Sequence, residues 1–234
     1  MTDACMRRAV PAVAFLLAGA LSTAAAEPPA GFKSLFNGKD LAGWEGNPDF
    51  WSVKDGVITG ETTKEKPTKG NTFLIWKDGT LGDFELRVAW KLASGNTGIQ
   101  YRSKDFGNFV VGGYQADMDA GNTYTGILYE ERGRGILVKR GEKLLIQADG
   151  KKVVQGRTAE EKQIVEALKK DDWNEYVIIC KGPHVTQVLN GVTTVDLTDE
   201  QEDKRALTGI LALQLHAGPP MRVQFKDIYL KDLK

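Results

Sequence analysis

The sequence predicts an all-β protein, a jelly-roll sandwich of antiparallel strands with one concave sheet and one short helix. About a dozen segments have the alternating or continuous apolar pattern of strands. Turn dipeptides such as Asn-Gly and Asp-Gly separate these segments at short intervals, which is typical of β-sandwiches. Only one segment has apolar residues at helical spacing.

The first 26 residues have the pattern of a secretory signal peptide. Arg7 and Arg8 are followed by an apolar run over residues 9–21 and by alanines at 24–26. We expect cleavage before Glu27, because the apolar run is shorter than the roughly 20 residues that span a bilayer. A retained membrane anchor is the alternative. The sequence therefore predicts a periplasmic or secreted protein with one domain over residues 27–234 and no membrane attachment after cleavage.

Composition excludes several classes of partner. The 234 residues include 31 basic and 31 acidic side chains with no basic run, which argues against binding to nucleic acid or an anionic membrane surface. Cys5 leaves with the signal peptide, so no internal disulfide is expected and the core alone must stabilise the fold. Cys180 lies in an apolar run and is expected to be a small buried residue.

The first half of the domain contains the most regular strand pattern. Residues 83–92 alternate apolar and polar side chains, which predicts a long strand over the core. Asp55 and Gly56 predict a tight hairpin turn. The other strands expected here are residues 31–36, the apolar pattern around Trp44, Trp51 and Val53, and residues 57–61 and 72–76. We expect the five tryptophans to lie in the core.

The second half repeats the pattern around one helix. Thr158 and Glu161 have the spacing of a capping box and open a segment with helical periodicity that ends near Lys170. Apolar parity switches between Phe225 and Ile228, which predicts a β-bulge in the last strand. The strands expected here are residues 125–130, 135–139, 173–181, 184–189, 192–197 and 221–230.

Three segments carry polar side chains in a row on one strand face. They are residues 97–102, 112–119 and 209–216, where apolar and hydrogen-bonding residues alternate with period two. The polar residues are Gln100, Arg102, Gln115, Asp117, Asp119, Gln214 and His216. Such a face is suited to a polyhydroxylated ligand.

An ordered set of motifs resembles the 3-keto-disaccharide hydrolase domain family, whose members act as 3-keto-glucoside lyases and hydratases. The motifs include LFNGKDLAGW at 35–44, NTGIQYR at 96–102 and GILALQLH at 209–216. The remaining matches are residues 51–56, 83–86, 113–114, 125–129, 172–174 and 189–191. The resemblance implies a concanavalin A-like sandwich. It also implies an exported carbohydrate-active enzyme that cleaves 3-keto-glycosides or 3-keto-disaccharides by elimination and hydration.

One motif departs from the family pattern. After Gly113 and Tyr114 the commoner pattern has Glu, an apolar residue and Gln, whereas this chain has Gln115, Ala116 and Asp117. The carboxylate has moved two positions along the same strand face. Asp117 is therefore the expected substitute for the family's glutamate, and the preferred substrate is expected to differ.

The implied chemistry needs a base for the proton at sugar C2, an acid for the departing oxygen and donors for the enolate. Asp117 and His216 are the acid and base candidates, because histidine titrates near neutral pH. Arg102 is the candidate for polarising the ketone or enolate. The alternatives are a structural histidine bonded to a backbone carbonyl, and a salt bridge from Arg102 to Asp117 or Glu85.

Substrate binding is expected from amides and aromatic rings. The candidates are Gln100, Gln115 and Gln214 for sugar hydroxyls, and Tyr114 or Tyr129 for stacking on a ring. Glu130, Glu131, Arg132 and Arg134 border the site from a loop or form a solvated turn. His184 is expected to be inert.

We predict no cofactor. Asp117, Asp119 and Asn122 are possible ligands of a divalent metal, but their spacing matches no metal motif. The expected partner is an oxidised saccharide, supplied by an upstream sugar 3-oxidoreductase. The alternative functions are a non-catalytic, lectin-like carbohydrate-binding module and an accessory domain that acts only beside a partner oxidoreductase. A lectin needs amides and aromatics but no histidine-carboxylate pair.

Overall fold

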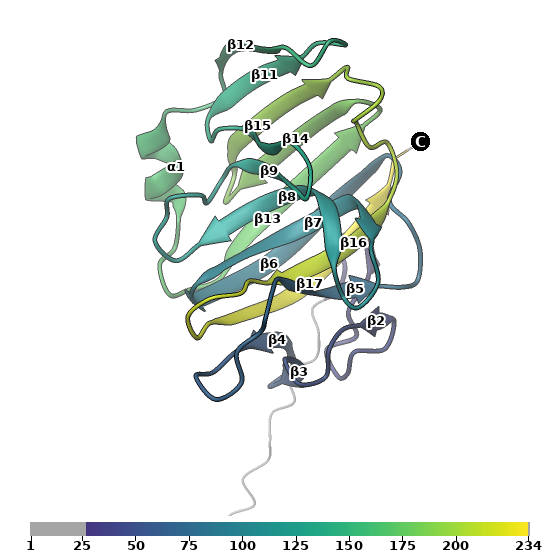
Figure 1. Cartoon of the computed structure of the whole chain (residues 1–234), viewed down its shortest axis with the longest axis vertical. Helices are drawn as coiled ribbons and strands as arrows, with labels where there is room; N and C mark the ends of the chain where they lie inside the picture. The colour runs from purple at the N-terminus through teal and green to yellow at the C-terminus, as the bar shows by residue number, and fades with distance from the viewer. Residues whose placement is uncertain (1–26, 234) are drawn as a thin grey trace, which may run out of the picture.

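The computed structural model describes residues 27–233 and contains two β-sheets packed face to face, with one α-helix among these residues (Figure 1). The prediction of a β-sandwich with a single short helix is confirmed. The signal-peptide prediction concerns residues 1–26, which lie outside the described residues. Within the described part of the chain, no helix is long and apolar enough to cross a membrane.

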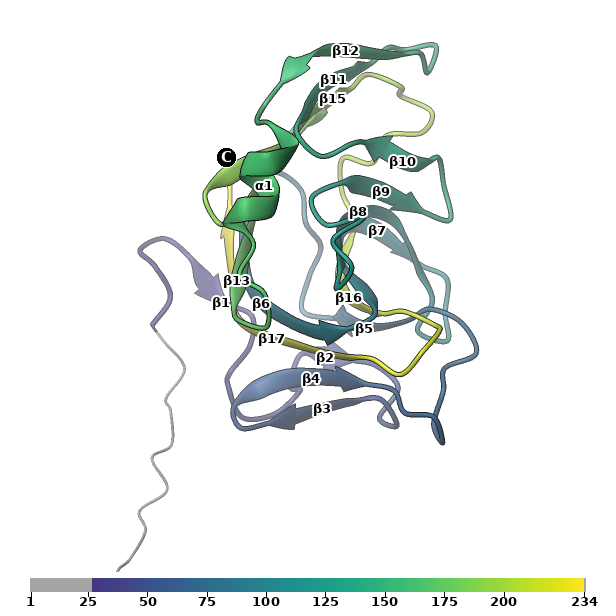
Figure 2. The ribbon, with the colours of Figure 1, turned by 90° about the vertical axis from the view of Figure 1, so that its left-hand side faces the viewer.

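The larger sheet has ten strands and strong curvature (Figure 2). Its order is β12 (Lys152–Arg157), β11 (Glu142–Ile146), β15 (Val192–Asp199), β14 (His184–Leu189), β13 (Asn174–Lys181), β6 (Phe84–Ser94), β17 (Arg222–Asp232), β4 (Val57–Glu61) and β3 (Trp51–Lys54), with β1 (Lys33–Ser34) beside β17. Its strand pairs are antiparallel except for β11 and β15, which run parallel. Strands β11 and β12, and this parallel pair, were not predicted.

The smaller sheet has seven antiparallel strands and faces the first across the core (Figure 2). Its order is β10 (Gly135–Val138), β9 (Leu128–Glu131), β8 (Val111–Asp119), β7 (Asn96–Asp105), β16 (Ile210–Leu215), β5 (Thr72–Trp76) and β2 (Trp44–Glu45). The three predicted polar-faced segments become β7, β8 and β16, which are neighbours in the order β8-β7-β16. Residues far apart in the sequence therefore meet on one surface.

The core lies between the two sheets. In β6, Phe84, Leu86 and Val88 are completely buried and alternate with partly exposed polar residues, as the period-two pattern predicts. From the other sheet, Ile99 of β7 and Leu213 of β16 belong to the same buried cluster. The alternating strands therefore place one face on the core and turn the other outward.

The N-cap of helix α1 (Glu161–Ala167) is Glu160, two residues after the predicted N-cap Thr158. The capping box joins Glu160 to Gln163, whose Oε1 accepts from the Glu160 N–H at 3.0 Å. Thr158 instead donates its hydroxyl hydrogen to the carbonyl of Thr193 at 2.7 Å. The predicted box between Thr158 and Glu161 is wrong because Thr158 is held by a neighbouring strand.

Other local predictions have mixed outcomes. The predicted bulge in the last strand is confirmed, since β17 changes register between Lys226 and Tyr229 and Asp227 has φ of 48°. The strand expected at residues 31–36 is reduced to the two residues of β1. His184 begins β14, at the first residue of the predicted strand 184–189, and its Nε2 lies 2.9 Å from Asp196 Oδ1.

Four of the five tryptophans are buried, namely Trp44, Trp51, Trp76 and Trp90. Trp173 does not fit that prediction, because it is half-buried beneath the ammonium group of Lys226, 4.5 Å from its ring centroid. Cys180 is buried as predicted, and burial raises the pKa of its thiol to about 12. A thiol in this state is a packing residue and not a nucleophile.

Candidate functional site

A cavity of about 500 Å³ lies on the outward face of the seven-stranded sheet. Gln115 and Asp117 of β8 reach it because Tyr114, Ala116 and Met118 of the same strand point into the core. Its lining residues are Asn71, Asn96, Gln115, Asp117, Tyr124, Ile127, Tyr129, Glu131, Ile136, Gln214 and His216. Carboxylate, imidazole, amide and aromatic groups thus converge on one space.

Asp117 is the most perturbed carboxylate of this cavity. Only 6% of the residue is exposed, and its Oδ1 accepts from Asn96 Nδ2 at 3.0 Å and from the Met118 N–H at 2.9 Å. Burial raises the pKa of Asp117 to about 7, and the charges of Asp119 and Glu131 act in the same direction. The two hydrogen bonds lower it, but burial dominates. Asp117 can therefore gain or lose a proton near neutral pH.

This raised pKa makes a prediction about stability. Because the folded state holds the Asp117 proton more tightly than the unfolded chain, ionising Asp117 destabilises the fold as pH rises from about 4 to 7. We expect Asp117→Asn to be more stable than wild type above pH 7, by on the order of 3 to 4 kcal/mol, and to lose that advantage near pH 4. Urea unfolding at several pH values measures the difference. Asp203→Asn, at an exposed position, should show no such trend.

His216 directly follows β16 and also lines the cavity. Its Nδ1 donates to the carbonyl of Ala217 at 2.5 Å, which leaves Nε2 to form a hydrogen bond with a ligand. The Ala217 N–H donates to Asn71 Oδ1 at 3.0 Å, and Asn71 Nδ2 donates to Glu131 Oε1 at 3.3 Å. The backbone contact foreseen as a structural alternative therefore orients the imidazole beside the cavity.

Gln115 is positioned by the glycine opposite Asp117. Gly98 of β7 pairs with Asp117, and a Cβ added at Gly98 would lie 2.2 Å from Gln115 Cδ. Only glycine lets the Gln115 side chain lie across β7. Gln115 Oε1 accepts from Gln100 Nε2 at 2.8 Å, so the Gln115 Nε2 group remains to donate to a ligand. Gln100 is completely buried and does not line the cavity, which corrects its predicted role as a direct ligand of sugar hydroxyls.

Gln214 lines the cavity as predicted and carries an unsatisfied acceptor. Its Nε2 is 3.5 Å from Glu131 Oε2, and its buried Oε1 has no hydrogen-bond partner among the described residues. A buried amide oxygen without a donor costs free energy.

Two predicted substrate-binding residues lie on the opposite side of the sheet. Tyr114 is buried, and its hydroxyl donates to Asp199 Oδ2 at 2.5 Å. Glu130 Oε2 accepts from Arg134 Nε at 2.8 Å, and Arg134 also binds Asp199. The prediction that Tyr114 and Glu130 line the site is wrong, because strand alternation turns them inward. Tyr129 does line the cavity, as predicted.

Arg102 is the largest correction. Its backbone has φ of 48°, and the pairing of β7 with β8 breaks between Tyr101 and Lys104. The side chain has no exposed area and donates to the carbonyls of Gly82 and Gly182 at 2.8 and 2.7 Å. The prediction that Arg102 shares a face with Asp117 and His216 is therefore wrong. A salt bridge was the alternative, but its partner is Asp83 at 2.9 Å, and not Asp117 or Glu85.

Several lining residues were missed or weighed wrongly. Glu131 reaches the cavity because it has the same strand parity as Tyr129, a signal that favours it over Glu130. Asn96 lines the cavity, although the sequence singles it out only as the first residue of the motif at 96–102. Asn71 precedes β5, which pairs with β16 in the chain's second half, so only the three-dimensional pairing places it near His216.

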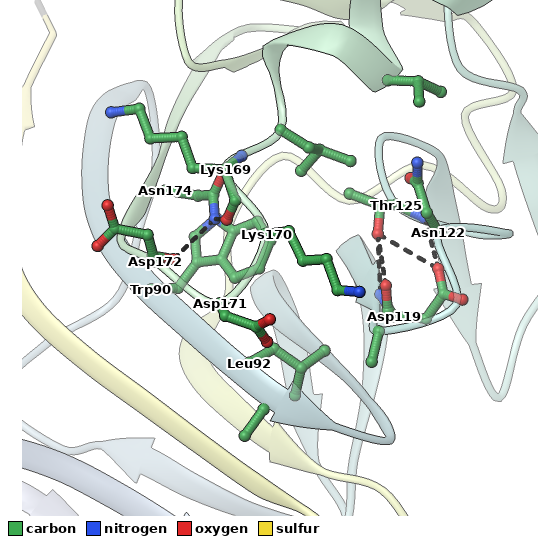
Figure 3. Close-up of a pocket in the computed structure, with 14 residues that line it drawn as sticks. Trp90, Leu92, Asp119, Asn122, Thr125, Lys169, Lys170, Asp171, Asp172 and Asn174 are labelled. Atoms are coloured by element: carbon green, nitrogen blue, oxygen red, sulfur yellow. Dashed lines mark hydrogen bonds between the residues drawn. The ribbon is translucent and has the colours of Figure 1, made fainter.

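A second cavity of about 310 Å³ lies near α1 and the segment that follows it, between Trp90, Lys170 and Asp119 (Figure 3). Asp119 and Asn174, two polar residues that line it, already form hydrogen bonds with backbone groups of the protein. Asp119 accepts from the backbone N–H groups of residues 123–125 at 2.7 to 2.9 Å. Asn174 Nδ2 donates to the carbonyls of Lys169 and Asp172 at 2.9 and 3.0 Å. We therefore assign the candidate site to the larger cavity.

The structure offers little support for a metal centre. Within residues 27–233 there is no group of three or more His, Cys, Asp and Glu side chains that would hold an ion. The oxygens of Asp119, one of the three possible ligands, are taken by backbone N–H groups. The absence of a cofactor stays a prediction.

Comparison with known proteins identifies a matching family and several structures of similar fold. Residues 31–231 match the model of the 3-keto-alpha-glucoside-1,2-lyase-like domain. No curated protein matches the sequence. Among solved structures, a candidate glycosyl hydrolase from Parabacteroides distasonis ATCC 8503 is 21% identical with a TM-score of 0.58, over 87% of this chain and 94% of that one.

Two further structures share the fold at lower identity. The carbohydrate-binding module CBM66 from Bacillus subtilis is 13% identical with a TM-score of 0.53, over 81% of this chain and 96% of that one. The endo-beta-1,3(4)-glucanase SCLam of family GH16 has the same identity and TM-score, over 89% of this chain and 94% of that one. At these identities the likeness is one of fold alone.

Proposed function

The chain belongs to the 3-keto-alpha-glucoside-1,2-lyase-like domain family, and on that premise we propose that it cleaves 3-keto-glycosides by elimination followed by hydration. Family membership supports a carbohydrate-active function. The observation that carries the finer proposal is the shared cavity of Asp117, whose pKa is raised to about 7, and His216, whose Nε2 is available. A site with two proton-exchanging groups suits elimination, which needs one base and one acid.

In the proposed first step, the ketone at C3 acidifies the hydrogen at C2. The Asp117 carboxylate removes that proton, and the electrons of the C2–H bond form the C1–C2 double bond. The C1–O bond breaks, and the departing oxygen takes a proton from His216 Nε2. The products are an enone and the free leaving group.

In the proposed second step, water adds to the enone. The oxygen of water attacks C1 while one of its protons passes to His216, and Asp117 returns a proton to C2. Both groups regain their starting protonation states. The sum of the two steps is hydrolysis of the glycosidic bond.

Charge on the enolate needs donors, and the chain offers amides in place of Arg102. Gln115 and Asn71 line the cavity, where the lower local dielectric strengthens the interaction of their amide N–H groups with a developing negative charge. A rotation of the Gln214 side chain that turns its unpartnered Oε1 into the cavity would let it accept from a sugar hydroxyl. Gln100 acts through Gln115 and is a positioning residue.

We also propose that the protein is exported and depends on a sugar 3-oxidoreductase. Arg7, Arg8 and the apolar run over residues 9–21 support export. The substrate must already carry a ketone, so a reaction that oxidises the C3 hydroxyl of a glycoside must precede this one.

The test compares one disaccharide in its unoxidised and 3-keto forms. The protein is expected to release a monosaccharide from the 3-keto form only. In deuterated solvent, the C2 position of the product should carry deuterium, because elimination breaks the C2–H bond. Product that keeps its full C2 hydrogen would rule out elimination. Binding of both sugars without any product would mark the chain as a carbohydrate-binding module.

A further inference from the structure

A second hollow adjoins the site cavity. It has a volume of about 300 Å³ and shares Tyr124, Ile127 and Ile136 with the larger cavity of about 500 Å³. Its other lining residues are Thr123, Lys139, Arg140, Glu142, Arg157 and Glu161. Volumes of this order are those of ordinary ligand clefts. The two hollows are therefore neighbouring parts of one depression, divided by the shared residues.

Two of the shared residues are apolar side chains left in solvent. Tyr124 is 46% exposed and Ile136 is 41% exposed, although each has a large apolar surface. Ile136 of β10 pairs directly with Tyr129 of β9, so its side chain lies beside a ring that lines the larger cavity. We call Tyr124 and Ile136 the ridge. An exposed apolar ridge inside a polar depression is a feature of ligand binding.

The backbone holds the ridge in place. The Tyr124 N–H donates to Asp119 Oδ1 at 2.7 Å, and the Tyr124 carbonyl accepts from the Ile127 N–H at 3.1 Å. Ile136 belongs to a paired strand. A ring displayed on a fixed turn loses little conformational entropy when a ligand stacks on it. The ridge is thus prepared for a flat, partly apolar partner.

Two basic side chains in the walls beyond the ridge, Arg140 and Arg157, already have acidic partners. Arg140 Nη1 donates to the carbonyl of Asn122 at 2.8 Å, and its Nη2 binds Glu161. Arg157 Nε lies 3.2 Å from Glu160 Oε1. Lys139 and Glu142 add one charge of each sign, so the walls offer donors and acceptors with little net charge, which matches hydroxyl groups better than an ionised ligand. The chemistry that fits both ridge and walls is a second sugar ring.

We propose that this adjoining hollow is the leaving-group subsite, in which the ring attached at C1 of the 3-keto sugar stacks on Tyr124 and Ile136. This inference rests on the proposed function, because it takes the larger cavity as the site of the 3-keto ring. The preferred substrate is then a 3-keto-disaccharide, and a glycoside with a small leaving group leaves the ridge uncovered. Binding energy from the ridge supports the chemistry in the neighbouring cavity.

The test uses methyl 3-keto-α-glucoside and a set of 3-keto-glucosyl disaccharides that differ only in linkage. Wild type is expected to have a kcat/KM at least about 10-fold higher for the fastest disaccharide, because one well-placed stacking contact is worth about that factor. Because Tyr124 and Ile136 also line the larger cavity, Tyr124→Ala and Ile136→Ala are expected to lower the disaccharide value several-fold more than they lower the methyl glycoside value. Phe106→Ala, which removes an exposed ring outside both hollows, should change neither value.

Two results overturn the subsite while the proposed function stands: equal wild-type kcat/KM for both kinds of substrate, or ridge variants that affect both equally. If wild type processes no 3-keto sugar, the proposed function fails and binding decides the subsite separately. Calorimetry with unoxidised disaccharides and methyl α-glucoside is then the readout. If wild type binds a disaccharide more tightly than methyl α-glucoside, and Tyr124→Ala removes this difference in affinity, the subsite is supported. If wild type binds both ligands equally, the subsite is overturned.

Discussion

Asp117→Asn is expected to lower the turnover of a 3-keto-disaccharide by about 100- to 10,000-fold, the usual cost of removing a positioned general acid or base. Asparagine keeps an oxygen that accepts from Asn96 and from the Met118 N–H, so the local hydrogen bonds survive. It cannot take the C2 proton. The loss should therefore fall on kcat, with binding of the unoxidised disaccharide little changed.

The pH profile separates catalysis from structure. With Asp117 as the base, kcat/KM should rise with pH up to about 7, where the carboxyl ionises, and Asp117→Asn should lose this limb. His216→Gln should lower turnover by a similar factor. A profile that keeps its rise near pH 7 in Asp117→Asn would assign the base to another group. If Asp117→Asn is more stable but turns over more slowly than wild type, Asp117 lowers stability and supports catalysis, as active-site residues often do.

The fold was predictable because local signals and burial agree. In β4 and β5 the predicted and observed bounds coincide, since turn residues and apolar runs delimit both strands. Strands β11 and β12 were missed because β12 is mostly exposed and its sequence lacks clear alternation. The parallel pairing of β11 with β15 joins segments about 50 residues apart, and no local pattern encodes it.

The candidate site was predictable only as far as strand alternation holds. Asp117, Gln115, Gln214 and His216 were placed correctly, because β8 and β16 keep their period of two through the cavity. Arg102 was misplaced because β7 does not: the break after Tyr101 rotates the next side chain away from the outward face. The positive φ of Arg102 therefore removes its side chain from the cavity, and the proposed enolate donors become the cavity amides.

The stability of the fold is expected to depend strongly on Arg102. Arg102→Met should lower the free energy of unfolding by on the order of 2 to 3 kcal/mol, because several loop carbonyls lose a fully buried charged donor. The guanidinium joins three loops, because it donates to the carbonyls of Gly82, Gly182 and Ala206. Arg102 Nη2 also donates to Asp83 Oδ1 at 2.9 Å, and the same oxygen accepts from the Gly182 N–H at 2.8 Å.

The measurement is urea unfolding of Arg102→Met, Arg102→Lys and Arg222→Met, with turnover recorded on the folded fraction. Lysine keeps the charge but lacks the planar fork that reaches three carbonyls, so Arg102→Lys should recover only part of the stability. Arg222 is exposed on β17, and its removal should change stability by less than about 0.5 kcal/mol. Folded Arg102→Met should keep wild-type kcat, because the side chain lies outside the cavity. A folded variant without turnover would return Arg102 to the catalytic machinery and contradict the arrangement of Asp117, His216 and the cavity amides.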